Sequence, residues 1–187
     1  MGAAFILYKG DETMRENGFG KDTVAIGAGV GINEHAKWQP KWIIEKYNEN
    51  MRLYEVEEID GNLLLTEGIS EFMKVACGIG GATAFSNATA YIGVGDGTAA
   101  ADSSQTGLLG SNKTYAPMDA TFPSVSNNTM TFRATFGPTS GNHNWREFTV
   151  ANGNSDTAKN LNRKVETALR SKAEPDTWVV QLLITIS

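Results

Sequence analysis

The chain has few of the residues that mark several common classes of protein. Its 187 residues include a single cysteine, Cys77, so an internal disulfide framework is excluded. Cys77 follows Val75 and Ala76 at the end of a helix-like stretch, and we expect it to be a thiol packed in the core. Without disulfides, stability has to come from packing or from assembly with other chains.

Long apolar runs and positive charge are also scarce. The longest apolar stretch, WVVQLLITI, is about half of the ~20 residues that cross a membrane as a helix. The net charge is −5, which argues against nucleic acid as the main partner because binding to phosphates requires a basic face. The N-terminal MGAAFILYKGDE lacks the basic start and the cleavage site of a secretory signal. We expect no membrane and no nucleic acid among the partners.

Catalytic motifs are missing as well. The two histidines, His35 and His143, belong to no hydrolase or metalloprotease motif. Glu147 lies close to Trp145 in the sequence, an arrangement that resembles the catalytic acid and stacking aromatic of a carbohydrate-active enzyme. We interpret Glu147 instead as a solvent-facing strand residue and Trp145 as a core or interface aromatic. We therefore expect a protein that is not an enzyme, with no catalytic residue and no cofactor.

Glycine, by contrast, is abundant, and two glycine-rich stretches resemble the start of a nucleotide-binding fold. They are AIGAGVGI at 25–32 and YIGVGDGT at 91–98. In both, the position three residues after the second glycine is not a glycine, and Pro40 prevents a long helix after the first stretch. We interpret YIGVG as a strand whose glycines let another backbone or an aromatic ring approach closely. We expect residues 99–108 to cross to the next layer.

Acidic residues near this second stretch raise the question of a cation. Asp96 and Asp102 flank the loop, Asp119 lies further along the chain, and His143 is remote. Calcium loops place oxygen ligands at alternate positions around one glycine turn, whereas here three alanines separate the two acids. We expect an Asp-Gly turn and no metal site.

The periodicity of the remaining chain predicts a mainly β fold, an antiparallel sandwich or barrel with one packed helix at about 66–77. The helix has Ile69, Phe72, Met73 and Ala76 on one face, with Thr66 as N-cap and Gly78 as the stop signal. Strands are expected at 41–47, 51–57, 129–136, 144–151 and 177–187, and the last of them alternates from Trp178 to Ile186. The stretch 160–172 is compatible with either a helix or a strand.

The chain divides into an extended, glycine-rich arm at 1–37 and a β-rich domain at 38–187. The arm shows no sustained periodicity, and it cannot bury enough apolar surface alone to offset the entropy of ordering it. Its apolar pieces and the WQPKWII stretch that follows are expected to contact other chains, in a dimer or trimer. The expected interface residues are Phe5, Ile6, Leu7, Tyr8, Val24, Ile26, Trp38, Trp42 and Ile44.

Several motifs resemble a group of structural proteins from tailed bacteriophages. They are NLLLTEGISEFMKVACG, NATAYIGVGDGTAAADSSQTGL, TMTFRATF, NHNWREFTVANG, LNRKVE and WVVQLLITIS, within about residues 61–187. The GVGDG…QTGL part is also loosely similar to tail-collar fibre domains. The resemblance implies a virion protein made in the cytoplasm of a bacterial host, with the major capsid protein or other virion proteins as partners. Capsid decoration (cement) is the function we expect first, and a tail-collar, fibre or baseplate role that contacts receptors or glycans is the alternative.

Overall fold

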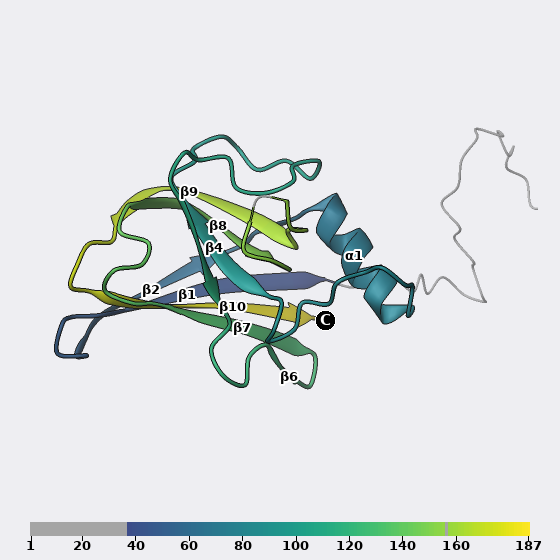
Figure 1. Cartoon of the computed structure of the whole chain (residues 1–187), viewed down its shortest axis with the longest axis horizontal. Coiled ribbons are helices and arrows are strands. Elements are labelled where there is room, and N and C mark those ends of the chain that lie inside the picture. Colours follow the sequence, from purple (N-terminus) through teal and green to yellow (C-terminus); the bar gives the residue numbers. More distant parts are fainter. Residues whose placement is uncertain (1–36, 156) are drawn as a thin grey trace, which may run out of the picture. The chain divides into compact units, whose positions relative to one another are not determined.

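The computed structural model describes residues 37–155 and 157–187, and the predicted interface residues between Phe5 and Ile26 lie outside them. The described chain forms two five-stranded antiparallel sheets that pack as a sandwich (Figure 1). One sheet has the order β2-β1-β10-β7-β6 and the other the order β3-β9-β8-β4-β5. The elements are β1 Trp38–Tyr47, β2 Leu53–Asp60, β3 Leu63–Leu64, α1 Thr66–Ala76, β4 Tyr91–Gly95, β5 Lys113–Pro117, β6 Ser124–Ser126, β7 Thr129–Phe136, β8 Asn144–Ala151, β9 Asn162–Ser171 and β10 Thr177–Ile186. The predicted fold class is confirmed.

The first sheet is held by long pairings around β10. This C-terminal strand pairs with β1 over its whole length on one side and with β7 on the other. Its alternating residues Val180, Leu182 and Ile184 are fully buried, as the sequence predicted. Because β10 is a central strand, its apolar face is covered by the chain itself.

The second sheet corrects the expected path of the glycine-rich loop. β4 pairs with β8 on one side and with β5 on the other. The residues between β4 and β5 therefore return to the sheet that they left, and the expected crossing to the next layer is wrong. The sandwich closes at this side through a bridge between Met118 and Ala134, where β5 runs on toward β7.

Aromatic side chains fill the space between the sheets. The ring of Trp145 lies 4.8 Å from that of Trp178 and 4.8 Å from that of Phe136, both edge to face. Trp145 is fully buried, so of the two predicted places, core or interface, the structure shows the core. Trp42 and Ile44 are fully buried too, so their side chains serve the core and are not available to another chain. The core thus absorbs most of the patch that we expected to need a partner.

The helix α1 differs in two ways from its expected form. Its N-cap is Leu65, whose side chain makes no capping hydrogen bond, and not Thr66. Gly78 does end the helix, with a φ of +67° that suits glycine. The buried residues of α1 are Gly68 and Glu71, whereas Met73 is 61% exposed. The predicted apolar stripe is therefore mostly not packed against the domain.

Two further expectations are settled by the sheets and the helix. The ambiguous stretch 160–172 is mainly a strand, since β9 pairs with β8. Cys77, expected in the core, is exposed beyond the last turn of α1, so that expectation is wrong. In the part of the chain that the structure describes, no helix has the length and apolar character that crossing a membrane requires.

Candidate functional site

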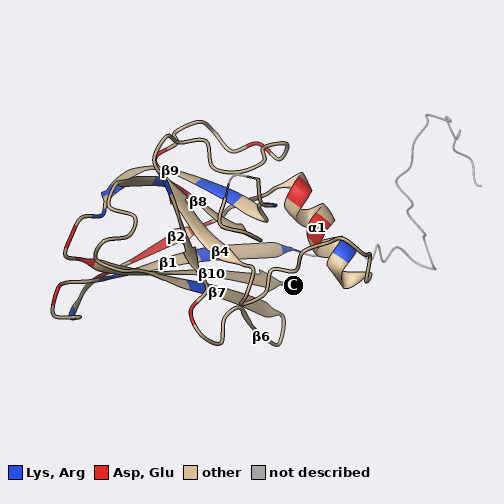
Figure 2. Cartoon of the chain, in the orientation of Figure 1, with Lys and Arg blue, Asp and Glu red and all other residues tan. Residues whose placement is uncertain are grey.

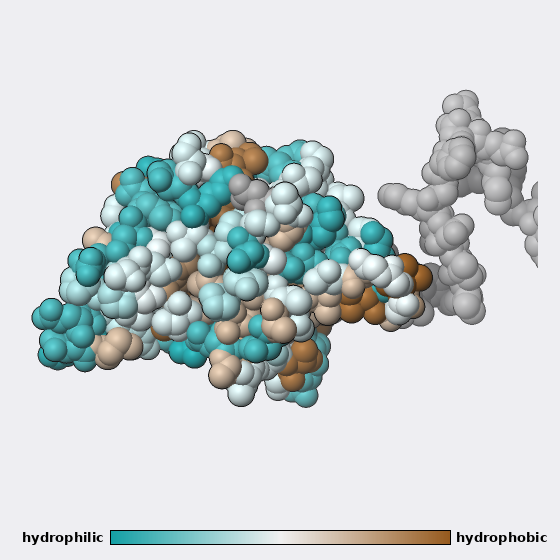
Figure 3. Space-filling model, in the orientation of Figure 1, coloured by the Kyte–Doolittle hydropathy of each residue, from teal (hydrophilic) through white to brown (hydrophobic). Residues whose placement is uncertain are grey.

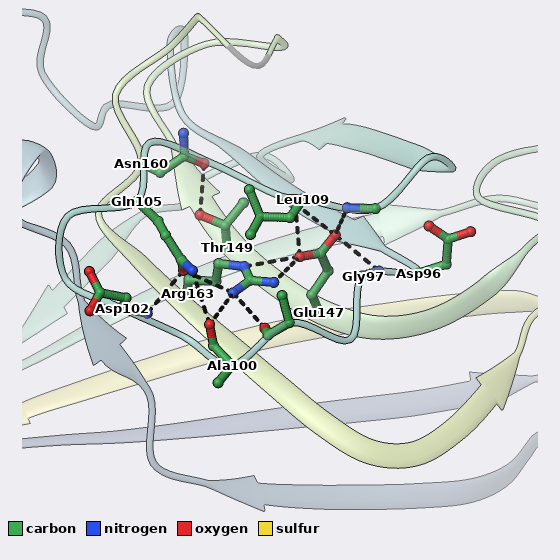
Figure 4. A network of polar contacts seen from close by, with 12 residues as sticks. Asp96, Gly97, Ala100, Asp102, Gln105, Leu109, Glu147, Thr149, Asn160 and Arg163 are labelled. Atoms are coloured by element: carbon green, nitrogen blue, oxygen red, sulfur yellow. Dashed lines mark hydrogen bonds and ion pairs between the residues drawn. The ribbon is translucent and has the colours of Figure 1, made fainter.

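The glycine-rich loop between β4 and β5 encloses a buried carboxylate. Glu147, on β8, is 0% exposed, so the prediction that it faces solvent is wrong. Its Oε1 accepts hydrogen bonds from the backbone N–H groups of Gly97 (3.2 Å), Leu109 (3.1 Å) and Gly110 (2.7 Å). These amides come from both ends of the loop, and they converge on one oxygen (Figure 4). The backbone amides of the loop thus bind an anion, which was not predicted from the sequence, and the anion is a side chain of the same protein.

Arg163, on the neighbouring strand β9, balances this carboxylate. Its Nε and Nη2 donate to Oε2 of Glu147 at 3.0 and 2.6 Å, and both side chains are fully buried. Its Nη1 donates to the carbonyl of Ala99 (3.0 Å) and to Oε1 of Gln105 (2.9 Å), both in the loop. A buried charge pair is tolerated only when hydrogen bonds complete it, and here both partners have several. The pair therefore fixes the loop from beneath.

The glycines of the loop make this approach possible. A Cβ on Gly97 would lie 2.6 Å from Oε1 of Glu147, and one on Gly95 would lie 2.5 Å from the same atom. Gly93 faces the ring of Tyr115, whose Cε1 would lie 2.6 Å from an added Cβ. The interpretation that the glycines of YIGVG admit another backbone or an aromatic ring is confirmed at Gly93, whereas the carboxylate at Gly95 was not predicted. The neighbours are an aromatic ring at Gly93 and a carboxylate at Gly95 and Gly97.

The three aspartates considered for a cation are used separately. Asp96 accepts hydrogen bonds from the side chain and backbone of Asn112, which hold the pKa of Asp96 below its usual range. The Ser104 hydroxyl does the same for the pKa of Asp102. Asp119 pairs with Arg133 at 2.9 Å. Within residues 37–155 and 157–187, no three acidic, histidine or cysteine side chains gather as metal ligands.

The loop and its polar network also hold α1. The N–H of Thr66, at the start of α1, donates to the carbonyl of Ser103 in the loop at 2.8 Å. Glu67 accepts from the N–H of Asn160 at 2.9 Å, and Asn160 in turn accepts from Thr149 on β8 at 2.9 Å. A Cβ on Gly68 would collide with backbone atoms of Asn160 and Leu161. The helix is thus attached by its first turn, through polar groups and one close glycine contact.

This attachment leaves an apolar surface on α1 pointing away from the sandwich, which we call the outer face of α1. On it, Ile69 is 36% exposed, Met73 61% and Ile79 56%. With Cys77 and three polar residues they line a shallow hollow of about 480 Å³. The space-filling view shows hydrophobic residues gathered at this end of the molecule (Figure 3). The few charges of the helix are balanced, because Glu67 pairs with Lys159 and Glu71 with Lys74 (Figure 2).

The predicted interface residues are not brought together in the described chain. Trp42 and Ile44 lie in the core. Trp38 is partly buried at the start of β1, and its ring packs edge to face on Phe72 of α1 at 6.1 Å. The remaining predicted interface residues precede the described part. Trp38 is therefore the one described member that contacts α1, and it does so through Phe72, which does not line the hollow of the outer face.

Sequence reasoning missed the pair of Glu147 and Arg163. The two residues stand in the motifs NWREF and LNRKV, and each is next to another charged residue, Arg146 or Lys164. The sequence therefore did not indicate which of the neighbouring charges is buried, and the stretch 160–172 was not assigned as a strand. The exposure of the outer face of α1 had no sequence signal, since an apolar stripe ordinarily packs inward.

Comparison with known proteins adds no relative. No family model matches the chain, and no curated protein and no solved structure matches it.

Proposed function

We propose that the protein is a non-enzymatic structural component of a tailed-phage virion, a capsid decoration (cement) protein that binds its neighbours through its arm and its β-domain. Its partners are further copies of itself and the major capsid protein or other virion proteins. It is made in the cytoplasm of the bacterial host and resides in the virion.

The observation that carries the proposal is the outer face of α1. An apolar surface that the domain leaves uncovered is a feature of proteins that bind other proteins. The helix is attached to the domain at its first turn by the contacts of Thr66, Glu67 and Gly68, which orient this surface. A preformed surface of this kind binds at a low cost in conformational entropy.

The residues that carry the resemblance support the same proposal. Gly95, Gly97, Glu147 and Arg163 belong to the quoted motifs, and they bind one another inside the domain. Their hydrogen bonds are directed at the loop and the pair itself. The motif residues therefore stabilise the domain. In a structural protein of this kind, residues outside the motifs would contact the neighbouring subunits.

Fitting the described domain into an electron-microscopy map of the phage particle tests the proposal. We expect density for the domain on the outer surface of the capsid, with α1 against a neighbouring subunit. Density confined to the tail would replace decoration by the collar, fibre or baseplate role. Absence of the protein from purified particles would overturn the virion role altogether.

A deletion tests the part assigned to the arm. Removing residues 1–36 keeps Lys37, whose backbone pairs with Ser187 in both directions, at 2.7 and 3.0 Å. We expect the melting temperature of the domain to stay nearly unchanged and incorporation into particles to be lost. Wild-type occupancy of the truncated protein would show that the arm is not the tether. Failure of the truncated protein to fold would place the arm in the core.

A further inference from the structure

The outer face of α1 is suited to an uncharged, extended segment. Its apolar residues Ile69, Met73 and Ile79 surround a shallow hollow, and the helix carries no unbalanced charge. The one charged residue that lines the hollow, Lys74, is paired with Glu71, so an occupant with a net charge would be desolvated there without an unpaired opposite charge to meet it. The occupant should therefore be neutral and apolar on one side.

One segment of the chain has this chemistry. Residues 23–32, TVAIGAGVGI, contain no charged residue. If the segment is extended, its alternate residues Val24, Ile26, Val30 and Ile32 share one side, with Ala28 among them. The other side carries Ala25 and three glycines. Such a strand has one apolar face to bury and almost no side chains on the opposite face.

The point at which the described chain begins favours the same segment. Lys37 and Trp38 enter β1 next to α1, because the ring of Trp38 packs on Phe72. Four residues separate Ile32 from Lys37 and can span about 17 Å from one to the other when extended. The described chain therefore begins at a residue next to the helix that carries the outer face.

We propose that Val24–Ile32 of one copy packs as an extended strand on the outer face of α1 of a neighbouring copy. This inference rests on the homo-oligomer named in the proposed function, and it assigns the surface that receives the arm. Exchange of a terminal segment between identical chains is an economical route to assembly, since one contact is repeated at every junction. Val24 and Ile26, predicted as interface residues, then meet Met73 and Ile79.

The exposed Cys77 reports on this contact directly, because it lines the same hollow and is the sole cysteine of the chain. We would introduce Ile26→Cys and Val30→Cys separately into the full-length isolated protein and oxidise it mildly. At least one variant should form a disulfide between two chains, identified by mass spectrometry as joining the new cysteine to Cys77. The wild type and an Ile26→Cys, Cys77→Ser double variant serve as controls. A disulfide within one chain, or none in either variant, would overturn the proposal.

A matched pair of substitutions measures the energy of the contact. Met73 is 61% exposed on the outer face of α1, and Met51 is 60% exposed in the turn before β2. Met73→Glu should weaken self-association by at least about tenfold, because a charge would be buried in the contact. Sedimentation equilibrium in an analytical ultracentrifuge measures the association constant. Met51→Glu should leave it unchanged. Equal effects of the two substitutions would overturn the assignment. Both experiments use isolated protein, so their failure is distinct from a failure to find the protein in the virion.

Discussion

The β4–β5 loop and the helix α1 both depart from the usual pattern of apolar residues inside and charged residues outside. The loop covers buried charges, and the helix exposes apolar residues. Beneath the loop, a carboxylate and a guanidinium lie fully buried among apolar strands. On α1, apolar residues lie in solvent, while Glu71 is only 7% exposed and accepts a hydrogen bond from the N–H of Thr83. The buried charges have their partners within the domain, whereas no residue of the described chain covers the exposed apolar residues. The comparison separates residues that stabilise the domain from residues that are free to bind.

The largest effect is expected at the buried carboxylate. Glu147→Ala would leave Arg163 charged and unpaired in the core and would remove the acceptor of three amides. Breaking a buried pair in this way costs about 3–5 kcal/mol of the free energy of unfolding, measured with urea.

A double variant with Arg163→Met should be less destabilised than the sum of the two single variants, since it leaves no lone charge. Glu58→Ala is the control, because its pair with Lys41 is exposed to solvent and contributes about 0–1 kcal/mol. A loss below 1 kcal/mol for Glu147→Ala would mean that water or a rearranged loop replaces the carboxylate.

The next largest effect is expected where glycine permits a close approach. Gly97→Ala would place a methyl group 2.6 Å from the Glu147 carboxylate, and such overpacking costs about 1–3 kcal/mol. Gly137→Ala is a matched control, because an added Cβ there meets nothing within 4 Å. Thermal unfolding of the two variants should differ in melting temperature, and equal melting temperatures would contradict the proposed steric role of Gly97.

A smaller effect is expected from a buried lysine outside both regions. Lys172 is 2% exposed and donates to the carbonyl of Gly137 (2.8 Å) and to Oδ1 of Asn142 (2.9 Å). Burial lowers the pKa of Lys172 below its usual 10.5. Between the lowered pKa and 10.5, the unfolded chain holds a proton that the folded chain has released, so stability should rise with pH across this window.

Urea unfolding of the wild type and of Lys172→Gln at a series of alkaline pH values measures this contribution. The difference in unfolding free energy between the two proteins should grow in favour of the wild type as the pH approaches 10.5. The tyrosines titrate in both proteins, so their contribution cancels in the difference. A difference that shrinks with rising pH would show that Lys172 is stabilised as an ammonium ion.

The smallest effect is expected on the outer face of α1. Met73→Ser in a monomeric preparation should change the free energy of unfolding by no more than about 0.5 kcal/mol, since surface positions contribute little to folding. Gly68→Ala, on the opposite side of the helix, should cost more than 1 kcal/mol because its Cβ would collide with the backbone of Leu161. Urea unfolding measures both. A large loss for Met73→Ser would move this face into the core and remove the basis for a docking surface.

Much of the fold could be predicted because strand periodicity is local. The alternation in β7 and β10 indicated which residues face the core, and Phe132, Phe136 and Leu182 are buried there. The stop at Gly78 is also local, since it depends on the backbone conformation of one residue. By contrast, the predicted burial of Cys77 and of the stripe on α1 depended on what packs against the helix, and periodicity does not contain that information.

The sequence by itself determined the mainly β architecture, the core-facing residues of β7 and β10 and the close approach of a neighbour at Gly93. These features follow from side-chain alternation, apolar burial and the small size of glycine, each of which acts within a few residues. Only the tertiary structure decided what the glycines admit and which face of α1 is covered. Glu147 and Arg163 are 16 residues apart in the chain and meet because β8 and β9 are neighbours. α1 presents its apolar side outward because Gly68 allows its other side to reach the backbone at Leu161, a contact between distant parts of the chain.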